Sequence, residues 1–99
     1  MGGERNYGRV EIYENGVWGT VCDDSWDITD ANVACRELGY TGATSAPTGA
    51  AYGRGSGHIL RDHINCQGSE TSLLRCNADK SKITPGHCGH GEDSSVVCY

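Results

Sequence analysis

The chain has 99 residues, with fifteen glycines, six cysteines and a formal net charge of −5 at pH 7. Its length suits one domain, and a domain of this size buries too little apolar surface to be very stable without cross-links. An acidic domain is a poor default binder of nucleic acid or of an anionic membrane. No run approaches the roughly 20 apolar residues of a membrane span, so we expect neither nucleic acid binding nor direct membrane insertion.

The cysteines indicate the compartment in which the protein folds. An even number of cysteines in a short, glycine-rich chain is typical of a disulfide framework formed under oxidising conditions. We therefore expect a secreted protein or the extracellular part of a membrane receptor. Counting alone does not choose among the alternative pairings. The six are Cys22, Cys35, Cys66, Cys76, Cys88 and Cys98.

The start of the chain is expected to lie outside the domain. Residues 1–7 lack the apolar core of a signal peptide. We interpret them as a linker remnant, and residues 8–99 as the single domain.

A β-hairpin is the first element that the sequence predicts. Residues 9–13 alternate polar and apolar side chains, and residues 17–21 are rich in β-prone types. Between them stands Asn15-Gly16, a pair that accepts the positive φ angles of a tight hairpin turn. We expect Trp18 to cover one face of this hairpin.

The sequence predicts one helix, over residues 30–38. Asp27 or Thr29 can cap its N-terminus and Gly39 can end it. Four apolar residues fall on one stripe at helical spacing, which predicts the face turned to the core. They are Ala31, Ala34, Cys35 and Leu38.

The remaining chain reads as loops and short elements. Glycines and Pro47 in residues 39–57 are typical of a loop. We expect short strands at residues 58–60 and 63–66, a helical turn within 68–76, an exposed loop at 77–91 and a closing strand at 95–98.

Six pieces of this sequence, in order, resemble the scavenger receptor cysteine-rich family, and the resemblance covers residues 8–98. Within the family, residues 44–47 and 55–57 most resemble domains of the salivary-agglutinin type. The pieces are Gly8-Arg9-Val10-Glu11, Trp18-Gly19-Thr20-Val21-Cys22-Asp23-Asp24, Ala34-Cys35-Arg36-Glu37-Leu38-Gly39-Tyr40, Asn65-Cys66-Gln67-Gly68-Ser69-Glu70, Ser72-Leu73-Leu74-Arg75-Cys76 and Cys88-Gly89-His90-Gly91-Glu92-Asp93.

The resemblance implies a fold and a disulfide pairing. The fold is a small disulfide-rich α+β domain, in which a curved antiparallel β-sheet cradles one α-helix. The extra bridge of the family's eight-cysteine form would fall near Asn6 and Tyr40, and neither is cysteine, so this chain matches the six-cysteine form. The bridges implied are Cys22–Cys88, Cys35–Cys98 and Cys66–Cys76.

A candidate cation site follows from the first of these bridges. It would bring together three acids, Asp23, Asp24 and Glu92, whose charges repel one another unless they are neutralised. Carboxylate oxygens suit Ca²⁺, with Mg²⁺ as the alternative. The same three positions correspond to a cation site in several family members. The alternative is a solvated acidic face or helix caps.

A second, weaker cation site is expected at Asp27 and Asp62. In some relatives an aspartate at the position of Asp62 binds a second cation. The sequence departs from them at His63 and at His87, where asparagine or an acid is usual. Capping of the helix explains Asp27 equally well.

Two other chemistries find little support. A zinc site is conceivable at His87, Cys88 and His90, with His58 and His63 as further ligands, but a bridge would occupy the sulfur of Cys88. No nucleophile motif such as Gly-x-Ser-x-Gly occurs, and the glycines of residues 53–57 lack the lysine of a phosphate loop. We expect no enzymatic activity.

The cationic candidates for an anionic ligand are Arg54 and Arg61, which flank the glycine-rich segment. Lys80 and Lys82 fit solvated surface charge better. We expect a calcium-dependent recognition module of the scavenger-receptor type, which binds polyanionic polysaccharides, microbial surface polymers or acidic host proteins. The alternatives are a metal-independent protein-docking domain, with an aromatic patch around Tyr52, and an accessory domain of a larger secreted enzyme.

Overall fold

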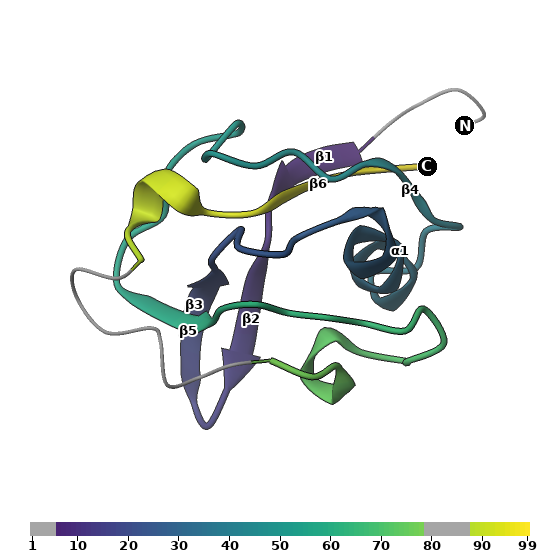
Figure 1. Ribbon diagram of the computed structural model, residues 1–99, viewed down its shortest axis with the longest axis horizontal. Helices are drawn as coiled ribbons and strands as arrows, with labels where there is room; N and C mark the ends of the chain where they lie inside the picture. The colour runs from purple at the N-terminus through teal and green to yellow at the C-terminus, as the bar shows by residue number, and fades with distance from the viewer. Residues whose placement is uncertain (1–5, 79–87) are drawn as a thin grey trace.

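Two three-stranded sheets and one α-helix form the frame of the protein, in a computed structural model that describes residues 6–78 and 88–99 (Figure 1). The first sheet has the order β1 (Asn6–Arg9), β6 (Ser95–Cys98), β4 (Ala43–Ser45), and both of its pairings are antiparallel. The second has the order β2 (Glu11–Glu14), β3 (Val17–Val21), β5 (His58–Arg61). The α+β, disulfide-rich class is confirmed, although two small sheets replace the single curved sheet that we expected.

The hairpin β2–β3 is confirmed, with Asn15 and Gly16 as its turn. Their φ angles are 54° and 81°, the left-handed values that a two-residue hairpin loop requires. The ring of Trp18 lies 5.2 Å from that of Tyr13, its cross-strand partner, and Trp18 is 61% exposed. This aromatic pair therefore covers the outer face of the hairpin.

The helix α1 runs from Ile28 to Glu37, close to the predicted range. Asp27 is its N-cap, and the stripe of Ala31, Ala34 and Cys35 is buried, as predicted. Leu38 was wrongly placed on that stripe, because it is the C-cap residue and is 67% exposed. The helix ends before the stripe completes another turn.

The short elements are mixed in outcome. The helical turn within residues 68–76 is η1 (Leu73–Arg75), and the closing strand is β6. The expected strand at 63–66 is reduced to one bridge between Asn65 and Asn77, while the expected loop at 39–57 contains β4. The expected loop at 77–91 ends in the 3-10 turn η2 (His90–Glu92), and its residues 79–87 lie outside the described part of the chain.

The three disulfides have the pairing that the resemblance implied. Cys35–Cys98 joins α1 to β6, Cys22–Cys88 joins the end of β3 to the approach to η2, and Cys66–Cys76 closes a short loop. All six cysteines are buried, and the bridges Cys35–Cys98 and Cys66–Cys76 belong to a core that also contains Val21, Val33 and Ile64. No helix in residues 6–78 and 88–99 is long and apolar enough to cross a membrane.

Candidate functional site

The end of β3 and the turn η2 are joined by one bridge and by backbone hydrogen bonds. Cys22 pairs with Cys88 and forms an isolated β-bridge with Asp93. The backbone N–H of Asp23 donates to the carbonyl oxygen of Glu92 at 2.8 Å. Residues almost seventy positions apart in the sequence are thereby held in register, and their acidic side chains share one end of the molecule.

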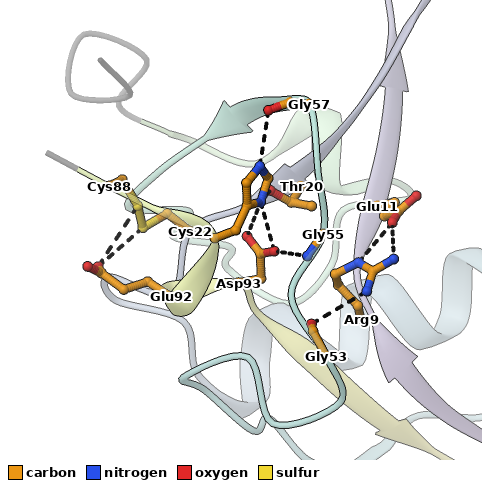
Figure 2. A network of polar contacts seen from close by, with 11 residues as sticks. Arg9, Glu11, Thr20, Cys22, Gly53, Gly55, Gly57, Cys88, Glu92 and Asp93 are labelled. Carbon is orange, nitrogen blue, oxygen red and sulfur yellow. Dashed lines mark hydrogen bonds and ion pairs between the residues drawn. A yellow bond between two sulfur atoms is a disulfide. The ribbon is translucent and has the colours of Figure 1, made fainter. Parts of the chain in front are cut away.

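Asp24 and Glu92 form the centre of the predicted acidic site. Their carboxylate oxygens and the sulfurs of the Cys22–Cys88 bridge lie within 4.8 Å of one another. Figure 2 shows Glu92 beside this bridge, with Oε1 at 3.5 Å from the sulfur of Cys22 and 3.9 Å from that of Cys88. Disulfide sulfurs carry no proton and neutralise no charge. In the described ranges, no lysine or arginine forms an ion pair with either acid.

Asp23, the third predicted ligand, occupies a different environment. Its Oδ2 accepts the backbone N–H of Gly49 at 2.7 Å. Asp23 therefore ties the loop before β5 to the end of β3, and it is absent from the groups of ligand atoms that the described residues bring within 4.8 Å.

Asp62, which the sequence suggested as a cation ligand together with Asp27, lies close to Asp24. One oxygen or nitrogen each from Asp24, Asp62 and His63 lies within 4.8 Å of the others. Asp62 is fully buried, and its Oδ1 accepts the backbone N–H of His63 at 2.8 Å. Burial raises the pKa of the Asp62 carboxyl above its ordinary value, and the charge of Asp24 raises this pKa further. Asp24 is therefore the acid that links Glu92 to Asp62.

Asp27 serves the helix. Its Oδ1 accepts the backbone N–H groups of Thr29 and Asp30 at 3.0 and 3.2 Å, and Asp30 Oδ2 accepts the N–H of Asp27 in return. This is the reciprocal pattern of a capping box. Of the two explanations of Asp27 that the sequence left open, the structure shows the cap.

The two arginines also differ. Arg61 is 5% exposed and is paired with Glu14 through both terminal nitrogens, with Nη2 at 2.7 Å from Oε2. It therefore carries no charge that is available to a ligand. Arg54 is exposed, and its guanidinium lies over Gly91, because a Cβ built there would be 3.8 Å from its Cζ. Lys80, Lys82 and His87 lie outside the described residues.

A polar network beside the acids was not foreseen from the sequence. His90 was considered there only as a zinc ligand, but its Nδ1 lies 2.9 Å from Asp93 Oδ2 and its Nε2 lies 3.0 Å from the carbonyl oxygen of Gly57. Burial lowers the pKa of His90, but the Gly57 carbonyl and the Asp93 carboxylate outweigh burial and raise this pKa above its ordinary value. Because the neighbouring sulfur is also part of a bridge, these contacts leave no zinc site at Cys88 and His90.

These features define a disulfide-stapled domain with an acidic site at one end. The family model of the scavenger receptor cysteine-rich domain matches residues 1–99, and the chain belongs to this family. Domains of the family are extracellular ligand-recognition modules.

Relatives and solved structures agree with this assignment. The chain is 50% identical to galectin-3-binding protein of Bos taurus over 97 residues, which cover 98% of this chain and 17% of that protein. Galectin-3-binding protein of Mus musculus is 47% identical, again over 98% of this chain and over 16% of its own length. The chain thus spans about a sixth of the length of these relatives.

Two crystal structures of single domains are similar over most of their length. The dimeric form of the scavenger receptor cysteine-rich domain of mouse MARCO is 44% identical, with a TM-score of 0.86, and the match covers 100% of this chain and 92% of that one. The third such domain of murine neurotrypsin is also 44% identical, with a TM-score of 0.82 and coverages of 93% and 84%.

Proposed function

We propose that this domain is a calcium-dependent recognition module for polyanionic ligands. The observation that carries the proposal is the closeness of Asp24 and Glu92, which the Cys22–Cys88 bridge holds together, while neither acid forms an ion pair with a lysine or arginine of the described residues. Two carboxylates at this distance repel each other, and a bound cation would relieve the repulsion.

The donor set fits calcium. Oxygen donors on three separate segments, from Asp24, Asp62 and Glu92, suit the flexible coordination that Ca²⁺ accepts. Mg²⁺ is the alternative, although it demands stricter octahedral geometry. Asp23, which spends one oxygen on the Gly49 N–H, adds negative charge beside them. We expect these residues to be the ligands, with water and backbone carbonyls completing the shell.

Calcium would supply positive charge and open coordination positions in a chain whose net charge is −5. Different residues of the chain would then bind the cation and the ligand. Asp24 and Glu92 hold the cation, and Arg54 offers an exposed guanidinium to a sulfate, phosphate or carboxylate group of the ligand.

The ligands that fit are polyanionic polysaccharides, microbial surface polymers and acidic host proteins. One site of this kind binds weakly, and useful affinity would come from several copies in one secreted protein or receptor.

The test measures binding to immobilised dextran sulfate, with calcium and with chelator. Wild-type protein should bind only with calcium, and Glu92→Gln should lower the affinity at least about tenfold, which is about 1.4 kcal/mol. Glu37→Gln is the matched control, because it removes the same charge at the far end of α1 and should bind as wild type does. Undiminished wild-type binding in chelator would rule out a metal-bridged mechanism.

A second candidate function is metal-independent docking of a protein partner. A groove of about 400 Å³ lies between the hairpin and the end of α1, and its lining includes Tyr13, Trp18, Leu38 and Leu74. All four side chains are exposed by more than a third. Tyr52, around which we expected an aromatic patch, stacks on Tyr7 with ring centres 4.7 Å apart. Calcium-independent binding that Trp18→Ala abolishes would favour this function.

A further inference from the structure

The glycine-rich segment 53–57 is fastened to the turn η2 by one buried acid and one histidine. The N–H of Gly55 donates to Asp93 Oδ2 at 2.7 Å, as Figure 2 shows. The carbonyl oxygen of Gly57 lies 3.0 Å from His90 Nε2. Gly55 and Gly57, which are separated by one residue, are therefore held by the neighbouring side chains of Asp93 and His90.

The segment approaches the pair so closely that Gly55 has no room for a side chain. A Cβ at this position would lie 2.6 Å from Thr20 Cγ2 and 3.1 Å from Asp93 Oδ2. The glycine thus permits the short hydrogen bond to Asp93, which is itself fully buried. This close fit indicates a segment with one defined position.

The contacts of His90 fix both ends of its ring. The carbonyl of Gly57 can only accept a hydrogen bond, so Nε2 is its donor, and the opposite nitrogen, Nδ1, lies 2.9 Å from the carboxyl group of Asp93. With a partner at each ring nitrogen, the ring is a rigid spacer between the buried acid and the segment.

Arg54 directly precedes Gly55, the first of the two residues that these contacts hold. Its guanidinium packs over Gly91, the residue directly before Glu92. Arg54 has no ion pair or hydrogen bond to the described part of the chain, so its position depends on the backbone that carries it. An arginine on a mobile loop would lose conformational entropy on meeting an anion, and an arginine that is already placed loses less.

We propose that His90 and Asp93 are positioning residues that hold Arg54 beside the acidic site. A ligand anion then meets the guanidinium and the site of Asp24 and Glu92 together. This inference rests on the proposed function, and it adds a role for two residues that touch neither the ligand nor the cation.

A double-mutant cycle tests the inference, with calcium present and dextran sulfate as the probe. Arg54→Ala should weaken binding about tenfold, the loss of one charge-assisted contact. His90→Ala should weaken it by a similar factor, and the double variant should bind no more weakly than Arg54→Ala alone. A residue that only stabilises the fold would instead give losses that add.

Conservative variants separate positioning from stability. In His90→Gln the side-chain amide can still donate to the Gly57 carbonyl from near the place of Nε2, so affinity should recover in large part. His58→Ala is the matched control, because it removes an exposed histidine next to Gly57 and should bind as wild type does. Calcium affinity should change less than about threefold in all of these variants. Additive losses, or failure of His90→Gln to recover affinity, would overturn the inference.

A measurement without ligand keeps the inference separate from the proposed function. The backbone amides of Arg54 and Gly55 should be ordered in wild type and in His90→Gln, and mobile in His90→Ala, by ¹⁵N relaxation. If wild type binds no dextran sulfate but shows this pattern, the proposed function fails and the positioning of Arg54 stands. Ordered amides in His90→Ala would overturn the positioning role whatever the ligand does.

Discussion

Two acidic regions lie close together in this molecule, and their surroundings differ. At the start of α1, Asp27 and Asp30 face each other, and both accept backbone N–H groups. Asp30, which is buried, accepts from Cys66 at 2.8 Å and from Asp27 at 3.0 Å. Backbone N–H groups of the helix N-terminus and of Cys66 thus hold these two carboxyl groups in place.

At the end of β3, Asp24 and Glu92 have a different environment. Glu92 faces the bridge sulfurs of Cys22 and Cys88, and Asp24 lies between Glu92 and the buried Asp62. The comparison teaches that closeness of acids does not by itself indicate a cation site. Two acids that accept hydrogen bonds from backbone N–H groups, or that pair with positive side chains, serve the structure. Two acids without such partners would gain from a bound cation.

The largest effect on stability is expected at the pair of acids at the start of α1, Asp27 and Asp30. Asp30→Ala leaves the buried N–H of Cys66 without its acceptor and removes half of the capping box, so the free energy of unfolding should fall by about 2–4 kcal/mol. Chemical denaturation measures this loss. Calcium affinity should be unchanged, and a large loss of calcium binding with little loss of stability would reverse the roles of the two regions.

The pH dependence of stability sharpens the same comparison. Burial raises the pKa of Asp30 from 3.8 to about 6, although the N–H groups of Cys66 and Asp27 lower it in part. The folded protein therefore holds this proton more tightly than the unfolded chain does. The contribution of Asp30 to stability is full below about pH 4 and is lost as the pH rises through about 6.

Denaturation at a series of pH values checks this sign. The unfolding free energy of wild type minus that of Asp30→Asn should fall between about pH 4 and 6.5 and then level off. Because both proteins contain all the other acidic residues, the subtraction cancels the contributions of those residues to the pH dependence. A difference that rises over this range would show that the hydrogen bonds to Asp30 outweigh its burial.

A smaller effect is expected from Asp27→Ala. Loss of an N-cap costs about 1 kcal/mol of stability, and thermal or chemical unfolding should detect it. Calcium affinity should stay within about twofold of wild type, because Asp27 spends its charge on the helix. Clearly weaker calcium binding would restore the second cation site at Asp27 and Asp62.

Local patterns were sufficient to predict several elements. The Asn15-Gly16 turn, the helix with its capping residue and the closing strand each depend on short-range chemistry, which a sequence displays directly. The pairing of strands does not. β3 and β5 run parallel across a connection that contains α1, and β4 forms from three residues of a glycine-rich loop. Nothing in such short segments indicates their partners.

The candidate site shows the same division. The disulfide pairing came from the family resemblance, and through it the closeness of Asp24 and Glu92 could be predicted. The engagement of Arg61 with Glu14 could not, because it joins two strands whose register depends on the whole fold. The role of His90 was missed for a related reason, since its acceptor at Gly57 is a backbone carbonyl with no side-chain signal.

Calorimetric titration of calcium into wild type and Asp24→Asn tests the central claim most directly. Wild type should bind with a dissociation constant of about 0.1–1 mM, the range of extracellular modules. Asp24→Asn keeps the shape of the side chain and removes the negative charge that lies between Glu92 and Asp62. This variant should bind calcium at least about tenfold more weakly than wild type does. Equal calcium binding by the two proteins, or no binding by wild type, would contradict a cation site at Asp24 and Glu92.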